Sequence, residues 1–143
     1  PLQLLFTTEG TEGTENGGGG VERDSLSHAV LGAAIFVHRA LGPGMLESVY
    51  SACLCHELNR RGVAFRRQAP MPLLYDGEWM DVSFRLDLLV ESELIVELKA
   101  VEQVLEIHRA QLITYLKLTG LKKGLLINVN VLRLMHGVTR VVV

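Results

Sequence analysis

Residues 84–90 read FRLDLLV and residues 94–100 read LIVELKA, and these two stretches decide how the chain folds. Both are apolar enough to form strands of a buried sheet, and residues 91–93 separate them as a tight turn. Each stretch nevertheless carries a carboxylate, Asp87 in the first and Glu97 in the second. An ionised carboxylate in an apolar strand costs free energy unless it is paired or binds a cation, so both residues are candidates for function.

The register between the two strands brings these carboxylates together. A turn centred on Ser92 predicts an antiparallel pair in which Asp87 lies opposite Glu97. Because side chains alternate along a strand, Lys99, two residues beyond Glu97, points to the same face. The sequence therefore predicts two carboxylates and one ammonium group side by side on one face of a sheet.

This trio suits metal-dependent hydrolysis of a phosphodiester. Two carboxylates directly opposite each other repel, and a divalent cation such as Mg²⁺ or Mn²⁺ converts that repulsion into coordination, with the Leu98 carbonyl as a further candidate ligand. The metal lowers the pKa of a bound water, and Lys99 can orient or help deprotonate that water, or stabilise the transition state. An alternative needs no metal: Glu97 with Lys99, and Asp87 with Arg85, would form ordinary cross-strand ion pairs.

The chain divides into a short tail and one domain. Residues 1–23 contain a Thr-Glu-Gly repeat followed by four glycines, a composition that buries little and has a large backbone entropy to lose on folding. Residues 24–143 form the domain, in which Asp76-Gly77 predicts a two-residue hairpin turn. Asp24 or Ser25 caps a first helix that runs to residue 41, and further helices are expected over 45–61 and 104–119, with strands over 65–68, 71–75, 78–82, 84–90, 94–100, 125–129 and 137–143.

This order of elements predicts an α/β (α+β) fold with a mixed central sheet flanked by helices. The helix at 104–119 joins the strands at 94–100 and 125–129, so these two strands should be parallel, with a right-handed crossover. The strand at 137–143 ends in three valines. An exposed apolar edge seeks a partner strand, so a homo-oligomer is expected.

Composition narrows the class of protein. With 143 residues and a net charge of −2, the chain resembles an ordinary globular domain rather than a strongly basic nucleic-acid coat protein. No apolar run reaches the roughly 18 residues that span a bilayer, and the first residues lack the features of a signal peptide. A cytoplasmic protein is therefore expected, with Cys53 and Cys55 as free thiols.

Other candidate side chains lie on the helices. Glu47 is near the start of the second helix, where the helix dipole also favours an acid. Gln111 and Tyr115 are four residues apart and share one face of the third helix, although a helix edge would also suit a half-buried tyrosine. His38, near the end of the first helix, is a candidate for substrate binding, although a single histidine is more often structural. A basic cluster that suits either phosphate binding or a solvated helix end comprises Arg60, Arg61, Arg66 and Arg67.

Six strings of the domain are informative together: VHRALGP at 37–43, GMLESVY at 44–50, RLDLLV at 85–90, IVELKA at 95–100, AQLITYL at 110–116 and GLLIN at 124–128. With these strings, the chain resembles the bacterial GxxExxY protein family. The likeness covers about residues 24–143, and residues 1–20 lie outside the family pattern. Leu86 stands where the nominal aspartate motif has a proline, a tolerated variation.

The resemblance implies membership of the PD-(D/E)XK nuclease superfamily and a restriction-endonuclease-like core. Asp87, Glu97 and Lys99 would form the catalytic triad, and Glu47 would join the two strand carboxylates around the metal. Two residues match a Q-x-x-x-Y motif that contacts nucleic acid or supports the site, namely Gln111 and Tyr115.

Two functions of different classes follow. The first is a Mg²⁺- or Mn²⁺-dependent nuclease that hydrolyses phosphodiester bonds in DNA or RNA. The alternative is a non-catalytic module that keeps the fold and the acidic cluster, and that binds nucleic acid or assembles with itself. Small size and the lack of a strongly basic surface favour this alternative. A direct ion pair between Glu97 and Lys99 would instead indicate a metal-free structural protein.

Overall fold

The computed structural model describes residues 24–143, so the predicted tail lies outside the described residues. In this part of the chain, no helix is long and apolar enough to cross a membrane. The elements, in chain order, are α1 (Ser25–Leu41), α2 (Glu47–Arg60), β1 (Phe65–Tyr75), β2 (Glu78–Val90), β3 (Leu94–Lys99), α3 (Glu106–Thr119), β4 (Lys123–Asn128), the short 3₁₀ helix η1 (Leu134–Gly137) and β5 (Val138–Val142).

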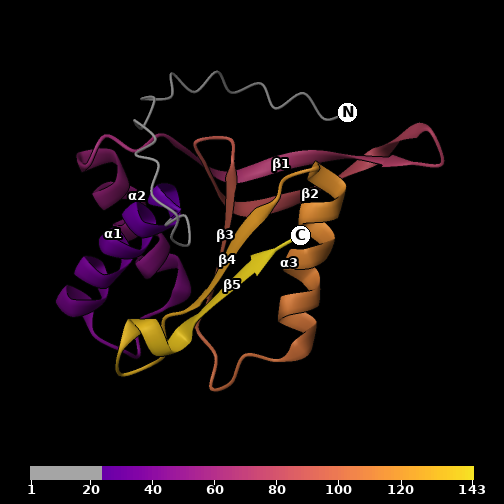
Figure 1. The fold of residues 1–143 in the computed structure, drawn as a ribbon. Helices are drawn as coiled ribbons and strands as arrows, with labels where there is room; N and C mark the ends of the chain where they lie inside the picture. Colours follow the sequence, from indigo (N-terminus) through magenta and orange to yellow (C-terminus); the bar gives the residue numbers. More distant parts are fainter. Residues whose placement is uncertain (1–23) are drawn as a thin grey trace, which may run out of the picture.

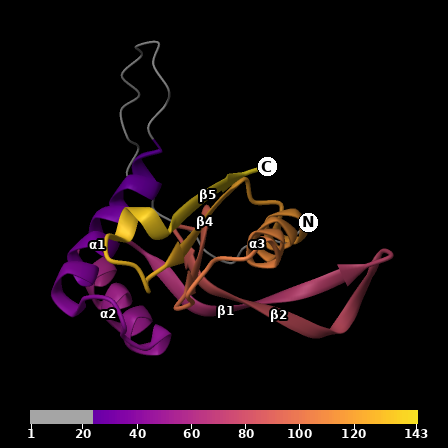
Figure 2. The same cartoon turned by 90° about the horizontal axis from the view of Figure 1, so that it is seen from below.

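The strands form one mixed sheet in the order β1-β2-β3-β4-β5. β3 and β4 are parallel, as predicted, and each of the other neighbouring pairs is antiparallel. Helices α1 and α2 cover one face of the sheet and α3 covers the other (Figures 1 and 2). The α+β class, with a central sheet flanked by helices, is therefore confirmed.

β1 and β2 are each longer than predicted. The strands expected over 65–68 and 71–75 are one strand, and those expected over 78–82 and 84–90 are another. The prediction of separate strands was wrong because it required an apolar pattern, whereas much of this hairpin is exposed and is held by backbone pairing. The turn at Asp76 and Gly77 is correct, with φ of +52° and +76°. The hairpin extends well beyond the rest of the sheet (Figure 1).

The hairpin changes faces partway along its length. In β2, Leu88 packs in the core under α1 and α2, but Leu86 packs in the core under α3. Residues two apart point to the same face of a regular strand, so β2 bends at Asp87. In β1, Gln68 has φ of +50°, and the register on either side places it opposite Asp87. The bend of both strands therefore lies at one level of the sheet, at Asp87 and Gln68.

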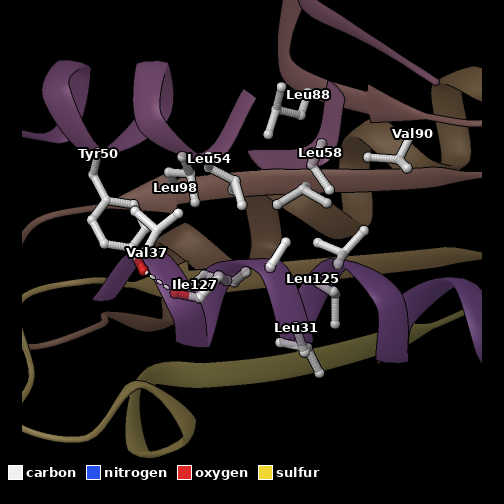
Figure 3. Close-up of a cluster of buried hydrophobic side chains, with 14 of the residues drawn as sticks. Leu31, Val37, Tyr50, Leu54, Leu58, Leu88, Val90, Leu98, Leu125 and Ile127 are labelled. Atoms are coloured by element: carbon white, nitrogen blue, oxygen red, sulfur yellow. Dashed lines mark hydrogen bonds between the residues drawn. The ribbon is translucent and has the colours of Figure 1, made fainter. Parts of the chain in front are cut away.

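Specific contacts fix the positions of the two N-terminal helices. The Asp24 carboxylate accepts hydrogen bonds from the N–H groups of Leu26 and Ser27 at 3.2 and 3.4 Å, which confirms the predicted helix cap. The hydroxyl of Tyr50 on α2 donates to the carbonyl oxygen of Ala34 on α1 at 2.6 Å, within the buried cluster shown in Figure 3. This bond ties α2 to α1 and so sets where the N-terminus of α2 meets the sheet.

Candidate functional site

The site begins where two strands separate. The backbone ladder between β2 and β3 ends at Leu88 and Val96. The next residues are Asp87 on β2 and Glu97 on β3, which the predicted register places opposite each other. Beyond this level β2 turns away from β3, and we call the point of separation the fork (Figure 1).

The two carboxylates replace the missing ladder bonds at the fork. The Asp87 N–H donates to Glu97 Oε1 at 3.1 Å, and the Leu98 N–H donates to Asp87 Oδ2 at 3.0 Å. Each carboxylate thus binds the backbone of the opposite strand, which fixes its orientation. Because each of these bonds engages a single carboxylate oxygen, the pair keeps coordinating capacity for a cation.

The fork holds its negative charge in a poorly solvated place. The Glu97 side chain is buried, with 4% of the residue exposed. Burial and the neighbouring charge of Asp87 raise the pKa of Glu97 to about 8, and Lys99 offsets this only in part. At neutral pH without a cation the pair therefore retains a proton, which a bound divalent ion would displace.

Glu47 approaches the fork from the N-terminus of α2. A depression of about 390 Å³ is lined by Glu47 together with Asp87 and Leu98. Burial and the charge of Asp87 raise the pKa of Glu47, while Lys99 lowers it, so these groups interact electrostatically. The other residues that line the depression are Leu46, Ser48, Ser51, Arg67 and Gln68.

The donor set at the fork fits a hard cation with water in its shell. Among residues 24–143, no three Asp, Glu, His or Cys side chains gather closely enough to hold a metal ion by themselves. The structure thus brings Asp87 and Glu97 together. Glu47 lies nearby but does not form a three-residue metal-binding group with them. Mg²⁺ typically binds through one or two carboxylates and keeps several waters, so the pair suits it. Asp87 and Glu97 would hold such an ion, which would supply a Lewis acid and an activated water.

Lys99 lies beside this pair without a fixed partner. Within the described part of the chain, neither Lys99 nor Arg85 forms an ion pair, whereas Lys123 pairs with Asp24 at 3.6 Å. The cross-strand ion pairs required by the metal-free alternative are thus missing from residues 24–143. The Lys99 ammonium therefore remains available for a ligand.

Helix α3 approaches the fork from the other face of the sheet. The Tyr115 ring stacks on Phe84 of β2, with centroids 5.1 Å apart. Burial, and then the charges of Glu97 and Asp87, raise the pKa of Tyr115, so its hydroxyl lies within electrostatic range of the carboxylates. Gln111, one turn earlier on α3, is exposed and does not line the depression.

His38 has a different environment from the other predicted site residues. Its imidazole is buried, and Nε2 lies 2.8 Å from the carbonyl oxygen of Val131. The ring also packs edge-on against Tyr50, with centroids 6.2 Å apart. These contacts hold the segment after β4 against α1, and they do not bring His38 to the depression.

The arginine cluster separates in the folded chain. Arg61 bonds Glu57 at 2.8 Å and Arg60 lies 3.9 Å from the same carboxylate, which matches a solvated helix end. Arg67 instead lines the depression, together with Ser51, which sequence reasoning missed. The signal for Ser51 was its i+4 spacing from Glu47, which puts both on one face of α2.

The fork thus combines a carboxylate pair and a lysine in a mixed sheet with helices on both faces. A family model described as the PD-(D/E)XK nuclease superfamily matches residues 24–141. The chain belongs to the PD-(D/E)XK nuclease superfamily. This match confirms the superfamily that the sequence resemblance implied. Comparisons with curated proteins and with solved structures gave no significant match.

Proposed function

We propose that this protein is a divalent-metal-dependent nuclease that hydrolyses phosphodiester bonds in DNA or RNA, with Mg²⁺ or Mn²⁺ as the cofactor. The facing carboxylates of Asp87 and Glu97 carry this proposal. They meet where the ladder ends, bind each other's strands, and place the buried Glu97 beside the half-buried Asp87. A divalent cation is the partner that offsets that charge, since no lysine or arginine among residues 24–143 pairs with them.

The residues around the fork have separate roles in this proposal. Asp87 and Glu97 bind the ion and orient each other through the backbone bonds described above. The Lys99 ammonium stabilises the negative charge that develops on the phosphate and holds the attacking water. Glu47 accepts a hydrogen bond from water in the depression. Tyr115 contacts the nucleic acid from α3, and Gln111 extends that contact along the same helix.

The compartment proposed for this activity is the cytoplasm. Cys53 and Cys55 are both free thiols in the structure. Thiols persist in the reducing cytosol and are typically oxidised in secreted proteins. The nucleic acid substrate is present in the same compartment.

Cleavage assays on purified variants test the nuclease proposal. We expect the parent protein to cut DNA or RNA only when Mg²⁺ or Mn²⁺ is present, and Glu97→Gln and Lys99→Ala each to lower the rate by roughly 100-fold or more. Glu93→Gln, in the exposed turn between β2 and β3, removes the same charge outside the fork and should keep the parent rate. A folded parent protein that cuts no DNA or RNA with either metal would sink the proposal.

A non-catalytic assembly module is the second candidate, and the exposed hairpin favours it. Tyr75, Trp79 and Val82 are 69%, 53% and 61% exposed on the distal part of β1 and β2. Large apolar groups that cluster on a protruding element often mark an interaction surface. Light scattering that gives a concentration-dependent oligomer, lost in Trp79→Ser, together with no cleavage, would select this function instead.

A further inference from the structure

The N-terminus of α2 opens into the depression without a side-chain cap. This helix has 14 residues, and its N-cap residue, Leu46, offers no side-chain hydrogen bond to the first turn. Leu46, Glu47 and Ser48 all line the depression. The first N–H groups of a helix carry its positive dipole end, so this turn presents donors to anything in the depression.

Ser51, one turn further along α2, is a buried hydroxyl that lacks a nitrogen or oxygen partner. The residue is only 7% exposed, and Ser51 Oγ is buried without a nitrogen or oxygen partner among the described residues. Ser51 is one of the residues that line the depression. Burial raises the pKa of the Cys55 thiol and a hydrogen bond with Ser51 offsets this in part, but a thiol is a weak hydrogen-bonding partner for a hydroxyl. A buried hydroxyl without a strong partner costs stability, which indicates that a ligand completes its bonding.

Arg67 brings a positive charge to the same part of the depression. It lines the depression and, within residues 24–143, belongs to no ion pair, unlike Arg60 and Arg61. Its charge partly offsets the rise that burial causes in the pKa of the Cys55 thiol on α2. Arg67 directly precedes Gln68, whose left-handed backbone, φ of +50°, bends β1 at this level.

We propose that Ser51, Arg67 and the first turn of α2 form a binding subsite for a phosphate group of the nucleic-acid strand. A hydroxyl, a guanidinium and helix N–H groups are the donors that bind a phosphate dianion or diester. This inference rests on the proposed function and names how that same site holds its substrate.

Charges in the depression explain where the phosphate binds. Glu47 and Asp87 also line it, and their carboxylates repel an anion. Ser51 and Arg67 line the same depression, so a phosphate would bind beside these donors and away from the carboxylates. The depression therefore combines carboxylates that suit a cation with donors that suit a phosphate.

Binding measured without metal separates this subsite from catalysis. The probe is a short fluorescent single-stranded DNA, titrated by anisotropy in EDTA over a range of salt concentrations, so that metal-dependent hydrolysis does not interfere. We expect Arg67→Ala to weaken binding about tenfold and to reduce the slope of log K against log salt by about one. Ser51→Ala should weaken binding several-fold and raise the midpoint of thermal unfolding, because it removes an unsatisfied buried hydroxyl.

Arg60→Ala is the matched control, since it removes the same charge from a residue that pairs with Glu57. It should change the affinity by less than about twofold. DNA probes with and without a 5′-phosphate show which phosphate the subsite binds. If the probe without a 5′-phosphate binds more weakly, the subsite binds the end of the strand. If both probes bind equally, it binds an internal phosphodiester.

The subsite is wrong if Arg67→Ala and Ser51→Ala bind the DNA like the parent, if the parent itself does not bind, or if Arg60→Ala weakens binding equally. A parent protein that still cleaves DNA in that case leaves the nuclease proposal standing. Conversely, variants that lose binding while no cleavage is found support the subsite and remove the nuclease proposal.

Discussion

At the scale of single residues, Glu97 is a carboxylate that the fold buries beside a second carboxylate. It lies at the end of a backbone ladder, where its Oε1 accepts the N–H of Asp87. Desolvation is the largest cause of its raised pKa, and the Asp87 charge is the next. A protein keeps such an arrangement at the expense of stability, which is typical of functional sites.

The pH dependence of stability tests this description of Glu97. Its pKa is raised from 4.5 to about 8 on folding, so protonation stabilises the folded state. This stabilisation is complete below the unfolded pKa and is lost as the pH rises through the folded pKa. In EDTA, we therefore expect the free energy of unfolding from urea titrations to fall by a few kcal/mol between about pH 4.5 and about pH 8.

Glu97→Gln keeps the shape of the protonated side chain and removes its titration. The variant should lack this part of the pH dependence. The difference in the free energy of unfolding between variant and parent should therefore grow as the pH rises. If parent and variant lose stability in parallel across this range, Glu97 titrates like an ordinary carboxyl group and the electrostatic description of the fork is wrong.

At the scale of elements, the bend of β1 depends on one residue in an unusual conformation. Gln68 has φ of +50°, in the left-handed region that favours glycine. Opposite it, β2 bends at Asp87 and leaves β3. The bent hairpin creates the fork, so backbone strain and the carboxylate pair occur at the same level of the sheet.

Two substitutions at Gln68 should move stability in opposite directions. Gln68→Gly relieves the left-handed conformation and should raise the free energy of unfolding by up to about 1 kcal/mol. Gln68→Val, with a β-branched side chain, should lower it by roughly 1–3 kcal/mol. The measurement is the urea midpoint at constant m-value. Ser83 of β2 is the control, because it is exposed and has an ordinary φ. There, Ser83→Val should be more stable than Ser83→Gly. If valine is also the more stable substitution at Gln68, the backbone of Gln68 is not strained.

Local patterns made most elements predictable. Asp24 as a helix cap, the Asp76-Gly77 turn and the register that faces Asp87 with Glu97 all depend on residues close in sequence. The continuity of β1 was not predictable, because its bend uses Gln68 where a glycine would have been the signal. That Ser51 and Arg67 line one depression was not predictable, because it depends on how α2 docks on the sheet.

At the scale of the whole molecule, the C-terminal part of the chain supports the strand that carries Lys99. The Asn128 side chain accepts the N–H of Val101 at 3.1 Å and donates to the Val101 carbonyl at 2.9 Å. The Lys99 carbonyl accepts the N–H of Val129 at 2.8 Å. Asn128 is buried, so these bonds hold the end of β3 firmly against the end of β4.

Gly137 is the residue on which this support depends most closely. A Cβ there would clash with the backbone carbonyl group of Asn128, which cannot move without moving its bonds to Val101. We expect Gly137→Ala to lower the free energy of unfolding by roughly 2 kcal/mol or more. Because the displacement passes through Asn128 to the end of β3, it should also lower any metal-dependent cleavage, although Gly137 does not line the depression.

Gly32→Ala is the matched control for this long-range effect. A Cβ at Gly32, inside α1, would meet only the flexible end of Arg61 at 3.4 Å. Alanine is the better helix former, so this variant should gain about 0.5–1 kcal/mol and keep the parent cleavage rate. Urea unfolding and cleavage measured on both variants separate the two cases. A Gly137→Ala protein as stable as the parent would show that the C-terminal segment does not hold the end of β3, and that Lys99 is positioned by β3 and β4 alone.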